Sequence, residues 1–482
     1  MTDLLRHNAN LIDGEWVPAD SGKTLDVINP ADGSVIGRVP NAGAAETRRA
    51  IEAAATAFTS FKQTLAAERA DMLFALYDAI RANIDELAHI LTAEQGKPIA
   101  EARGELALSA GYIRWFAEEA RRIYGDIVPS PFKNRKLLVT REPVGVCAAI
   151  TPWNFPSSML SRKVGPALAA GCTVVIKPAS QTPYSGLVWG ALAEMAGFPK
   201  GVVNVVTGSA REIGGELTAN PHVRKVTFTG STEVGKMLIA QSATTVKKVS
   251  MELGGNAPFI VFDDADLDKA VDAAMIAKYR NAGQTCVCTN RFLVQDGIHD
   301  AFVEKLTERS RALKVGPGTG EGIDQGPLID MDAVEKIEGL IADATDNGAK
   351  ILAGGKRHAL GGTFFEPTVL SGATTKMKIA SEEIFGPVSA VYRFAGEDEA
   401  IRIANDTPYG LACYFFSRDL GRAFRVADAL EYGLVGVNEG FFTTEVAPFG
   451  GVKESGLGSE GGRQGIEEYL VTKYISLGGL GG

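Results

Sequence analysis

Residues 146–180, VCAAITPWNFPSSMLSRKVGPALAAGCTVVIKPAS, decide the fold class of this chain of 482 residues. They read as a strand (VCAAI), a helix over residues 157–170 and a second strand (TVVIK). The same alternation continues through YSGLVWGALAEMAG, VVNVV, KVTFT, STEVGKMLIAQSA and APFIVF. Apolar strands that alternate with helices are typical of sheets buried on both faces. We therefore expect an α/β fold with a parallel sheet covered by helices on both sides.

The regions on either side extend this plan. The patterns before it predict helices over residues 43–58, 67–95 and 98–122. GDIVPSPFKNRKLLVTREPVG (125–145) follows, and its prolines, basic turn and β-like run predict a hairpin arm that leaves the first domain. A second α/β region is expected from about residue 266 to residue 450. The final EYLVTKYISLGG reads as a strand that could pair with the arm of another chain.

Composition excludes several classes of protein. The net charge of −9 argues against general nucleic-acid binding, which needs a basic surface. The first residues lack the apolar core of a secretory signal, and the longest uncharged stretch holds three prolines, so we expect neither export nor a membrane span. Five scattered cysteines suit the reducing cytoplasm, and neither they nor the five histidines show ligand spacing, so we expect no metal. The 55 glycines predict tight turns and close approaches of backbone to ligand.

Two glycine motifs resemble nucleotide-binding loops. GSTEVGKM (230–237) almost fits the phosphate loop G-x-x-x-x-G-K-[ST], but Met237 replaces the hydroxyl that should hold magnesium. Its strand, turn and helix still predict that the N–H groups of Gly230 and Ser231 bind an anion, best a nucleotide pyrophosphate. A plain turn capped by Ser231 is the alternative. GLGSEG (456–461) lies too near the end of the chain for the dinucleotide fingerprint, and we read it as a loop.

Cys286 is a candidate nucleophile. It lies in RNAGQTCVCTNR (280–291) between Arg280 and Arg291, whose positive charge would lower the pKa of the thiol and favour the thiolate. The alternative is an ordinary buried cysteine. Because no histidine lies nearby in sequence, a Cys–His hydrolase is not favoured.

Glu252 is a candidate general base. It is the only ionisable residue between Lys248 and Asp263, and an apolar setting raises the pKa of a carboxyl toward neutrality. The alternative is a salt bridge with Lys247 or Lys248.

Two polar residues follow predicted strands. Asn154, in TPWNFP, could donate to an oxyanion or could simply cap a turn. Lys177 lies at the carboxyl end of TVVIK, where α/β sheets bind ligands, although a lysine at a strand end can also snorkel to solvent.

Together these segments resemble the aldehyde dehydrogenase superfamily. The motifs that carry the resemblance, in chain order, are TPWNFP, VVIKPAS, FTGSTEVG, MELGGNAPFIV, GQTCVC, EEIFGP and PFGGVKESGLGSEGG. The resemblance implies a Rossmann-like cofactor domain (1–122 and 144–255), a second α/β catalytic domain (256–452) and a β-hairpin oligomerisation arm (123–143 and 466–482). It also implies NAD(P)⁺-dependent oxidation of an aldehyde to an acid.

The resemblance also assigns roles to single residues. Cys286 matches the nucleophile, which forms a thiohemiacetal and then a thioester, and Glu252 matches the base that activates water to hydrolyse it. Asn154 and the backbone N–H of Cys286 match the oxyanion hole. The positions that match cofactor contacts are Trp153, Lys177, Gly230, Ser231, Glu383 and Phe385.

Within the superfamily the chain most resembles bacterial succinate-semialdehyde dehydrogenases. Arg162 and Arg280 match the arginines that hold the far carboxylate of the substrate, and Thr443 or Thr444 matches a small hydroxyl residue. A guanidinium fork suits a carboxylate, although one arginine could instead pair with a structural acid. Glutarate semialdehyde is one methylene longer and would meet the same groups, so it remains the alternative substrate.

Further expectations concern the cofactor and the assembly. Relatives that prefer NAD⁺ place a Glu where Ser180 stands, so we expect NADP⁺ to be preferred and NAD⁺ also to be used. Cys288 could trap an oxidised Cys286 as a disulfide, or be a small core residue. A homotetramer is favoured over a dimer. The alternatives of another class are a cysteine acyl hydrolase and a non-catalytic nucleotide-binding protein.

Overall fold

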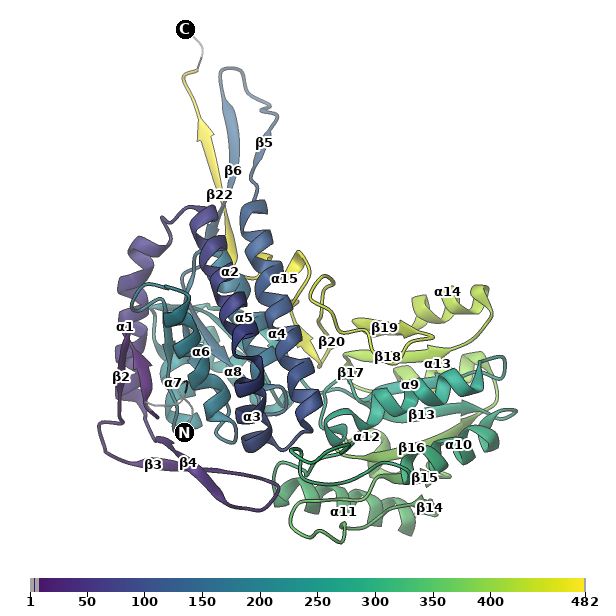
Figure 1. Ribbon diagram of the computed structural model, residues 1–482. Coiled ribbons are helices and arrows are strands. Elements are labelled where there is room, and N and C mark those ends of the chain that lie inside the picture. The colour runs from purple at the N-terminus through teal and green to yellow at the C-terminus, as the bar shows by residue number, and fades with distance from the viewer. Residues whose placement is uncertain (1–3, 5–7, 481–482) are drawn as a thin grey trace.

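The computed structural model describes Leu4 and residues 8–480 (Figure 1). Its first sheet has eight strands in the order β2-β1-β9-β8-β7-β10-β11-β21. Their bounds are β2 Glu15–Val17, β1 Asn10–Ile12, β9 Val203–Val205, β8 Thr173–Lys177, β7 Val146–Ile150, β10 Val223–Thr229, β11 Lys248–Glu252 and β21 Gly456–Leu457. The run from β9 to β11 is parallel, and β2, β1 and β21 are antiparallel additions at the edges.

Helices cover both faces of this sheet, as the alternating pattern predicts. Along β7, Cys147 and Ala149 face one core with α2, α4, α5 and α6, while Val146 and Ala148 face another with α1, α7 and α8. The helices are α1 Ala44–Phe61, α2 Ala66–Ala82, α3 Ile84–Gln95, α4 Ile99–Glu119, α5 Pro156–Ala170, α6 Pro183–Met195, α7 Ala210–Ala219, α8 Thr232–Ser242 and α15 Gln464–Glu467, with the 3₁₀ turns η2 Ala120–Arg122 and η3 Ala243–Thr245. Successive strand residues therefore bury opposite faces against different helices, which confirms the α/β class.

The second sheet has seven strands in the order β14-β15-β16-β13-β12-β18-β19. They are β14 Lys350–Ala353, β15 Thr368–Ser371, β16 Val388–Phe394, β13 Thr289–Gln295, β12 Ala257–Val261, β18 Ala412–Phe416 and β19 Leu434–Val437. All pairs except β14·β15 are parallel. The helices of this region are α9 Leu267–Tyr279, α10 His299–Arg311, α11 Met331–Asp346, α12 Lys378–Ser381, α13 Glu397–Asn405 and α14 Leu420–Ala429, with the 3₁₀ turn η4 Arg280–Gly283.

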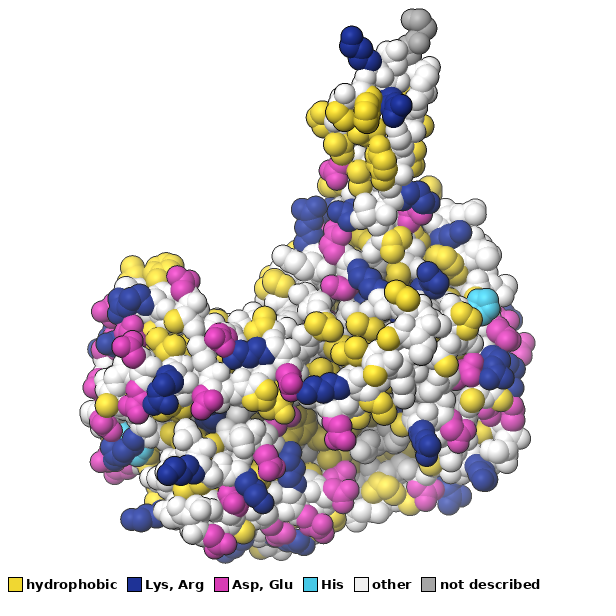
Figure 2. Space-filling model, turned by 180° about the vertical axis from the view of Figure 1, so that it is seen from behind, with side chains coloured by type: hydrophobic (Ala, Val, Ile, Leu, Met, Phe, Trp, Pro, Cys, Tyr) yellow, Lys and Arg dark blue, Asp and Glu magenta, His cyan; other side chains and the backbone are white. Residues whose placement is uncertain are grey.

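An arm projects from the first sheet region (Figure 1). It is a three-stranded sheet in the order β22-β6-β5, with bounds β22 Leu470–Leu477, β6 Lys136–Pro143 and β5 Asp126–Val128. The terminal strand β22 pairs with β6 of its own chain over eight residues and lies at the edge of this sheet, so pairing with another chain's arm stays a prediction. α15 ends directly beside the foot of the arm, which gives β22 a short local path to β6. Figure 2 shows hydrophobic side chains gathered on the arm.

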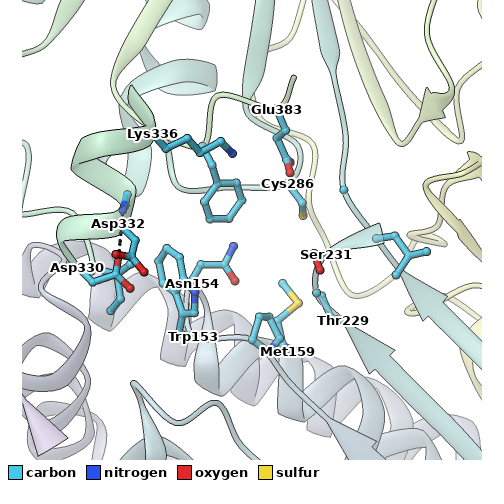
Figure 3. Close-up of a pocket in the computed structure, with 17 residues that line it drawn as sticks. Trp153, Asn154, Met159, Thr229, Ser231, Cys286, Asp330, Asp332, Lys336 and Glu383 are labelled. Carbon is cyan, nitrogen blue, oxygen red and sulfur yellow. Dashed lines mark hydrogen bonds between the residues drawn. The ribbon is translucent and has the colours of Figure 1, made fainter. Parts of the chain in front are cut away.

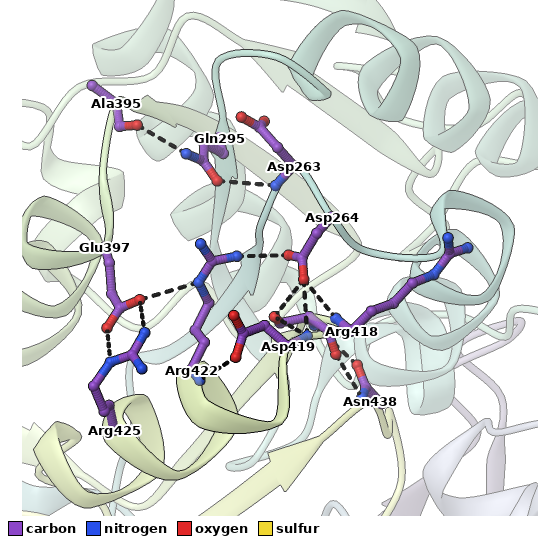
Figure 4. Close-up of polar contacts among 11 residues, drawn as sticks. Asp263, Asp264, Gln295, Ala395, Glu397, Arg418, Asp419, Arg422, Arg425 and Asn438 are labelled. Carbon is purple, nitrogen blue, oxygen red and sulfur yellow. Dashed lines mark hydrogen bonds and ion pairs between the residues drawn. The ribbon is translucent and has the colours of Figure 1, made fainter.

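Smaller elements complete the fold. Two short antiparallel ladders are β3 Thr24–Ile28 with β4 Val35–Pro40, and β17 Tyr409–Gly410 with β20 Val452–Lys453. Charged contacts hold α14 against the end of the second sheet (Figure 4). Arg422 contacts Asp264 at 2.7 Å and Glu397 at 3.1 Å, and Arg425 adds a second contact to Glu397 at 3.0 Å.

Candidate active site

The strand order of the first sheet reverses at β7, because β8 and β9 lie on one side of it and β10 and β11 on the other. Open α/β sheets bind ligands at this point, outside the carboxyl ends of the strands. Here the loop after β7 carries Trp153 and Asn154, and the loop after β10 carries Gly230 and Ser231. These four residues line a cavity of about 350 Å³ (Figure 3).

The second sheet supplies the opposite wall of this cavity. Cys286 lies just before β13, and Glu383 and Phe385 lie just before β16. The Phe385 ring meets the Trp153 ring edge-on, with centroids 5.5 Å apart. Glu383 accepts the Gly255 N–H at 3.2 Å, and burial raises its pKa to about 7. Five of the predicted cofactor contacts thus meet in one cavity, with Lys336 of α11 as a lining residue that the motifs did not indicate.

The expected role of Gly230 needs a correction. Its N–H donates to the carbonyl of Glu252 at 3.0 Å, since β10 and β11 are paired neighbours, and is therefore not available to an anion. The Ser231 hydroxyl accepts the Val234 N–H at 3.4 Å and caps α8. Anion binding at this turn would consequently fall to the first N–H groups of α8.

Two other predicted cofactor residues lie beside the cavity rather than in its wall. Lys177 ends β8, opposite Ile150 of β7, and its Nζ donates to the Pro178 carbonyl at 2.8 Å. Burial lowers the pKa of Lys177 to about 8. Ser180 follows on the exposed surface three residues later. Both lie at the carboxyl edge of the sheet, next to β7, whose following loop carries Trp153.

A second cavity, of about 500 Å³, meets the first at Cys286. Arg162, Arg280 and Thr443 line it, as does Phe449. Thr444 does not, because its backbone carbonyl accepts a hydrogen bond from Tyr112 and its side chain turns to Glu445. Of the two threonine candidates, the structure therefore brings only Thr443 to this cavity.

The two arginines differ in their surroundings. The Arg162 guanidinium is buried between the rings of Tyr112 and Phe449, at 5.0 and 4.4 Å from their centroids. Its Nε and Nη1 have no hydrogen-bond partner among the described residues, and the Glu460 carboxylate is 3.9 Å from Nη1. Arg280 lies over the rings of Phe155 and Phe441. Arg162 is thus a buried cation that lines the second cavity and has two donor atoms without a partner among the described residues.

The thiol of Cys286 differs from expectation. Burial, together with the Glu383 and Glu252 carboxylates, raises its pKa to about 12 against the lowering effect of Arg162 and Arg280. Arg291 does not contribute, because its guanidinium is bound to the carbonyls of Ile403, Ala404 and Asn256. Of the two flanking arginines, Arg280 thus lowers the pKa of the thiol as predicted and Arg291 does not, and the net pKa is raised rather than lowered.

Asn154 lies where an oxyanion donor is needed. Its carboxamide and the Cys286 thiol both line the first cavity (Figure 3). One N–H of Nδ2 donates to the Gln284 carbonyl at 3.1 Å, and the amide has a second N–H for a ligand. The side chain is thereby fixed to the loop that carries the nucleophile.

Glu252 ends β11 and is buried. Its Oε2 has no hydrogen-bond partner among the described residues, and burial together with the Glu460 carboxylate raises its pKa well above the ordinary value. The alternative of a bridge to Lys247 or Lys248 is wrong, because these lysines donate to backbone carbonyls elsewhere. Glu252 therefore has a buried environment and a raised pKa, which suit a general base.

Sequence reasoning missed the groups around Glu252. Lys163 pairs with Glu460 and donates to the Thr229 hydroxyl at 2.7 Å. Glu460 belongs to GLGSEG, which is more than a loop, since β21 within it pairs with β11 beside Glu252. In the sequence, only the glycines that follow Glu252 could have indicated that other backbone segments pack closely against it.

The remaining predictions have mixed support. All five cysteines are free, and the Cys288 thiol donates to the Lys278 carbonyl at 3.1 Å, so a Cys286–Cys288 disulfide stays a prediction. Among the described residues no group of three or more His, Cys, Asp or Glu could hold a metal ion. Within the same part of the chain, no helix has the length and apolarity that a membrane crossing requires.

Comparison with known proteins places this site in a family. The model of the aldehyde dehydrogenase family matches residues 16–475. The chain is 59% identical over 477 residues to a glutarate-semialdehyde dehydrogenase of Pseudomonas aeruginosa and 55% identical over 477 residues to the succinate-semialdehyde dehydrogenase (NADP⁺) of Escherichia coli, covering 99% of each chain in both cases. A crystal structure of succinate-semialdehyde dehydrogenase from Burkholderia pseudomallei superposes with a TM-score of 0.98 at 58% identity, covering 99% of both chains. The chain therefore belongs to the aldehyde dehydrogenase family.

Proposed function

We propose that this aldehyde dehydrogenase oxidises succinate semialdehyde to succinate, with NADP⁺ preferred over NAD⁺. The observation that carries the substrate assignment is Arg162, a buried guanidinium that lines the cavity ending at Cys286 and has two donor atoms without a partner among the described residues. A buried cation without a full set of partners is costly unless a ligand completes it. The carboxylate of the substrate would complete the hydrogen bonding of Arg162, while the aldehyde carbon at the other end of the same molecule contacts the Cys286 thiol.

The cofactor fits the first cavity. Gly254 lines this cavity, and a Cβ there would lie 3.2 Å from Glu383 Oε2, so a larger side chain would crowd the space. Trp153 and Phe385 offer an aromatic wall, and Glu383 offers a carboxylate to a ribose hydroxyl. NADP⁺ or NAD⁺, when bound, supplies the hydride acceptor.

The residues of the chain then divide the remaining chemistry. The Cys286 thiolate attacks the aldehyde carbon, and the Asn154 carboxamide donates to the resulting oxyanion. Loss of hydride leaves a thioester on Cys286. Glu252, unprotonated, takes a proton from water that hydrolyses this thioester and releases succinate. The thiol must first lose its proton against the raised pKa, so a positive ligand charge near Cys286 would favour the reaction.

Glutarate semialdehyde is the second candidate substrate, because a glutarate-semialdehyde dehydrogenase is among the relatives of highest identity. One methylene changes binding by only about 1–3 kcal/mol, so both acids can be substrates. The test is kcat/KM for succinate semialdehyde, glutarate semialdehyde and butanal with each cofactor. A value for butanal equal to the semialdehyde values would contradict the carboxylate assignment. Absence of reduced nicotinamide with every aldehyde would instead favour the cysteine acyl hydrolase.

The division into domains and the assembly are also proposals. The ranges 1–122 with 144–255, 256–452, and 123–143 with 466–482 each contain one of the three main sheets, apart from the edge strand β21. Residues 1–3, 5–7 and 481–482 of these ranges lie outside the described residues. The arm exposes Ile127 at 77%, Tyr474 at 60% and Phe132 at 56%. Apolar surface of this kind favours burial against further copies of the chain, and we propose a homotetramer in the cytoplasm. Light scattering after gel filtration would measure the mass.

A further inference from the structure

Lys97 is a fully buried lysine that no part of the proposed chemistry uses. It lies between α3 and α4, immediately after Gly96, and its side chain has no exposed surface. Its Nζ contacts Glu105 Oε2 at 2.6 Å and lies 3.8 Å from the centroid of the Phe155 ring. A buried ammonium of this kind is costly unless its contacts serve the fold or the site.

The third contact of Lys97 reaches the candidate oxyanion hole. Nζ donates to the backbone carbonyl of Asn154 at 2.7 Å, and Asn281 Nδ2 donates to the same oxygen at 3.0 Å. Glu105 also binds the backbone that follows, accepting N–H bonds from Ser157 and Ser158 at 2.9 and 3.1 Å. The Asn154 carbonyl and the backbone that follows it are thus held by one buried ion pair.

Gln95 makes the matching connection to the nucleophile loop. Its Nε2 donates to Asn281 Oδ1 at 2.9 Å, and its Oε1 accepts the Lys97 N–H at 3.0 Å. Asn281 and Ala282 both have a left-handed backbone, with φ of 52° and 55°, which non-glycine residues rarely adopt. Such a conformation persists only where its surroundings enforce it. Gln95 is one of the groups that hold this conformation, through its hydrogen bond to Asn281, which lies five residues before Cys286.

We propose that Gln95 and Lys97 form a positioning clamp that sets the distance between the Asn154 carboxamide and the Cys286 thiol. Lys97 holds the Asn154 backbone, Gln95 holds Asn281, and Asn281 binds both that backbone and the Gln284 carbonyl to which the Asn154 side chain donates. The two loops come from different sheets, so no strand pairing joins them. The proposal rests on the proposed role of Asn154 in oxyanion binding.

The test is a double-mutant cycle between Lys97 and Asn154, with kcat/KM for butanal as the readout so that no substrate carboxylate takes part. Asn154→Ala alone should lower kcat/KM by about 10²- to 10³-fold, the usual loss for one oxyanion donor. Lys97→Met should lower it by about 10- to 100-fold, because small misplacements of catalytic groups are that costly. In the Asn154→Ala background Lys97→Met should have less than a threefold effect, since it acts through Asn154.

Further variants separate positioning from general destabilisation. The double variant Lys97→Met/Glu105→Gln does not leave the Glu105 carboxylate without its partner. Gln95→Met removes the hydrogen bond to Asn281 and keeps the charges of Lys97 and Glu105. Each should lower kcat/KM when Asn154 is present and have little effect in the Asn154→Ala background. Lys225→Met removes another buried lysine, bound to Ser250 and Glu468 rather than to Asn154, and should lower thermal stability without a comparable loss of kcat/KM. Alkylation of Cys286 by iodoacetamide, which forms no oxyanion, should change less than threefold in every clamp variant.

Different failures have different meanings. If Lys97→Met and Gln95→Met leave kcat/KM unchanged, or lower it equally with and without Asn154, the clamp is refuted while the proposed function stands. If Asn154→Ala itself retains full activity, the oxyanion assignment is refuted, and the clamp with it.

Discussion

Replacing Arg162 by Met tests the substrate assignment most directly. Met keeps much of the side-chain volume between Tyr112 and Phe449 and removes only the charge and its donors. The guanidinium is already buried in the folded protein. Binding therefore includes the cost of desolvating the substrate carboxylate but not a further cost of desolvating Arg162. Glu460, the nearest acid at 3.9 Å, keeps its ion pair with Lys163 in the variant.

The size of the effect follows from the contact that is lost. A hydrogen bond to a charged group contributes about 1.5–3 kcal/mol, and about 1.4 kcal/mol corresponds to a factor of ten. We therefore expect kcat/KM for succinate semialdehyde to fall about 10- to 150-fold relative to butanal. The ratio matters because Arg162 also lowers the pKa of Glu252, so its loss will slow thioester hydrolysis for every aldehyde. That shared effect cancels in the ratio.

The assay is initial-rate formation of reduced nicotinamide with both aldehydes at saturating cofactor. The control is Arg69→Met, which removes another buried arginine, bound to the carbonyls of Ala169 and Thr64 and outside both cavities. It should leave the ratio unchanged. An equal fall for succinate semialdehyde and butanal in Arg162→Met would refute carboxylate recognition by this residue.

Three further predictions concern other groups. Glu252→Gln should give one burst of reduced cofactor and then stall, and the fall of wild-type kcat at low pH should be absent from the slow residual rate of the variant, because the base has a raised pKa and is active only above it; loss of the burst in stopped-flow would place Glu252 before hydride transfer. Wild-type kcat/KM should be higher for NADP⁺ than for NAD⁺, and Ser180→Glu should reverse the order by repelling the 2′-phosphate; a wild-type preference for NAD⁺ would contradict this. Burial raises the pKa of Glu94 from 4.5 to about 8, so the folded protein retains a proton that the unfolded chain releases, and stability falls as pH rises between these values. Glu94→Gln should reduce the difference between the free energies of unfolding measured in urea at pH 5 and pH 8. An unchanged difference would contradict the assignment of this pH dependence to Glu94.

The central sheet could be predicted from sequence because its strands are continuous apolar runs. TVVIK became β8 without any change of bounds, and the helix expected over 157–170 begins one residue earlier, at Pro156. The edge strands could not be predicted in this way. β1 and β2 have three residues each, and β21 has two, so none carries a readable period, and each pairs with backbone groups that its neighbouring strand leaves free.

The candidate site shows a similar limit. Cys286, Glu252 and Asn154 lie in distinctive short motifs, and the structure gathers them near one cavity or beside it. Lys97 and Glu460 were missed because their partners, Asn154 and Lys163, are 57 and 297 residues away. The pKa of Cys286 was predicted in the wrong direction for the same reason. Nearness of Arg291 in sequence says nothing about where its guanidinium points, whereas burial of the thiol depends on both sheets.

Which helix can receive an anion depends on what already occupies its N-terminus. At α5, after β7, Glu105 accepts the first N–H groups, and at α6, after β8, Glu94 accepts those of Tyr184 and Ser185 at 2.8 and 2.7 Å. These two acidic side chains come from α3 and α4, which cover that face of the sheet. A phosphate at either helix would have to displace a buried acid. Among the described residues, α8 is capped by its own Ser231, and it opens on the cavity beside the strand-order reversal. We therefore propose that the phosphates of the cofactor bind at α8, because the N-terminus of α5, on the Asn154 side of the reversal, is already occupied by Glu105, which leaves that side for the aldehyde and its oxyanion.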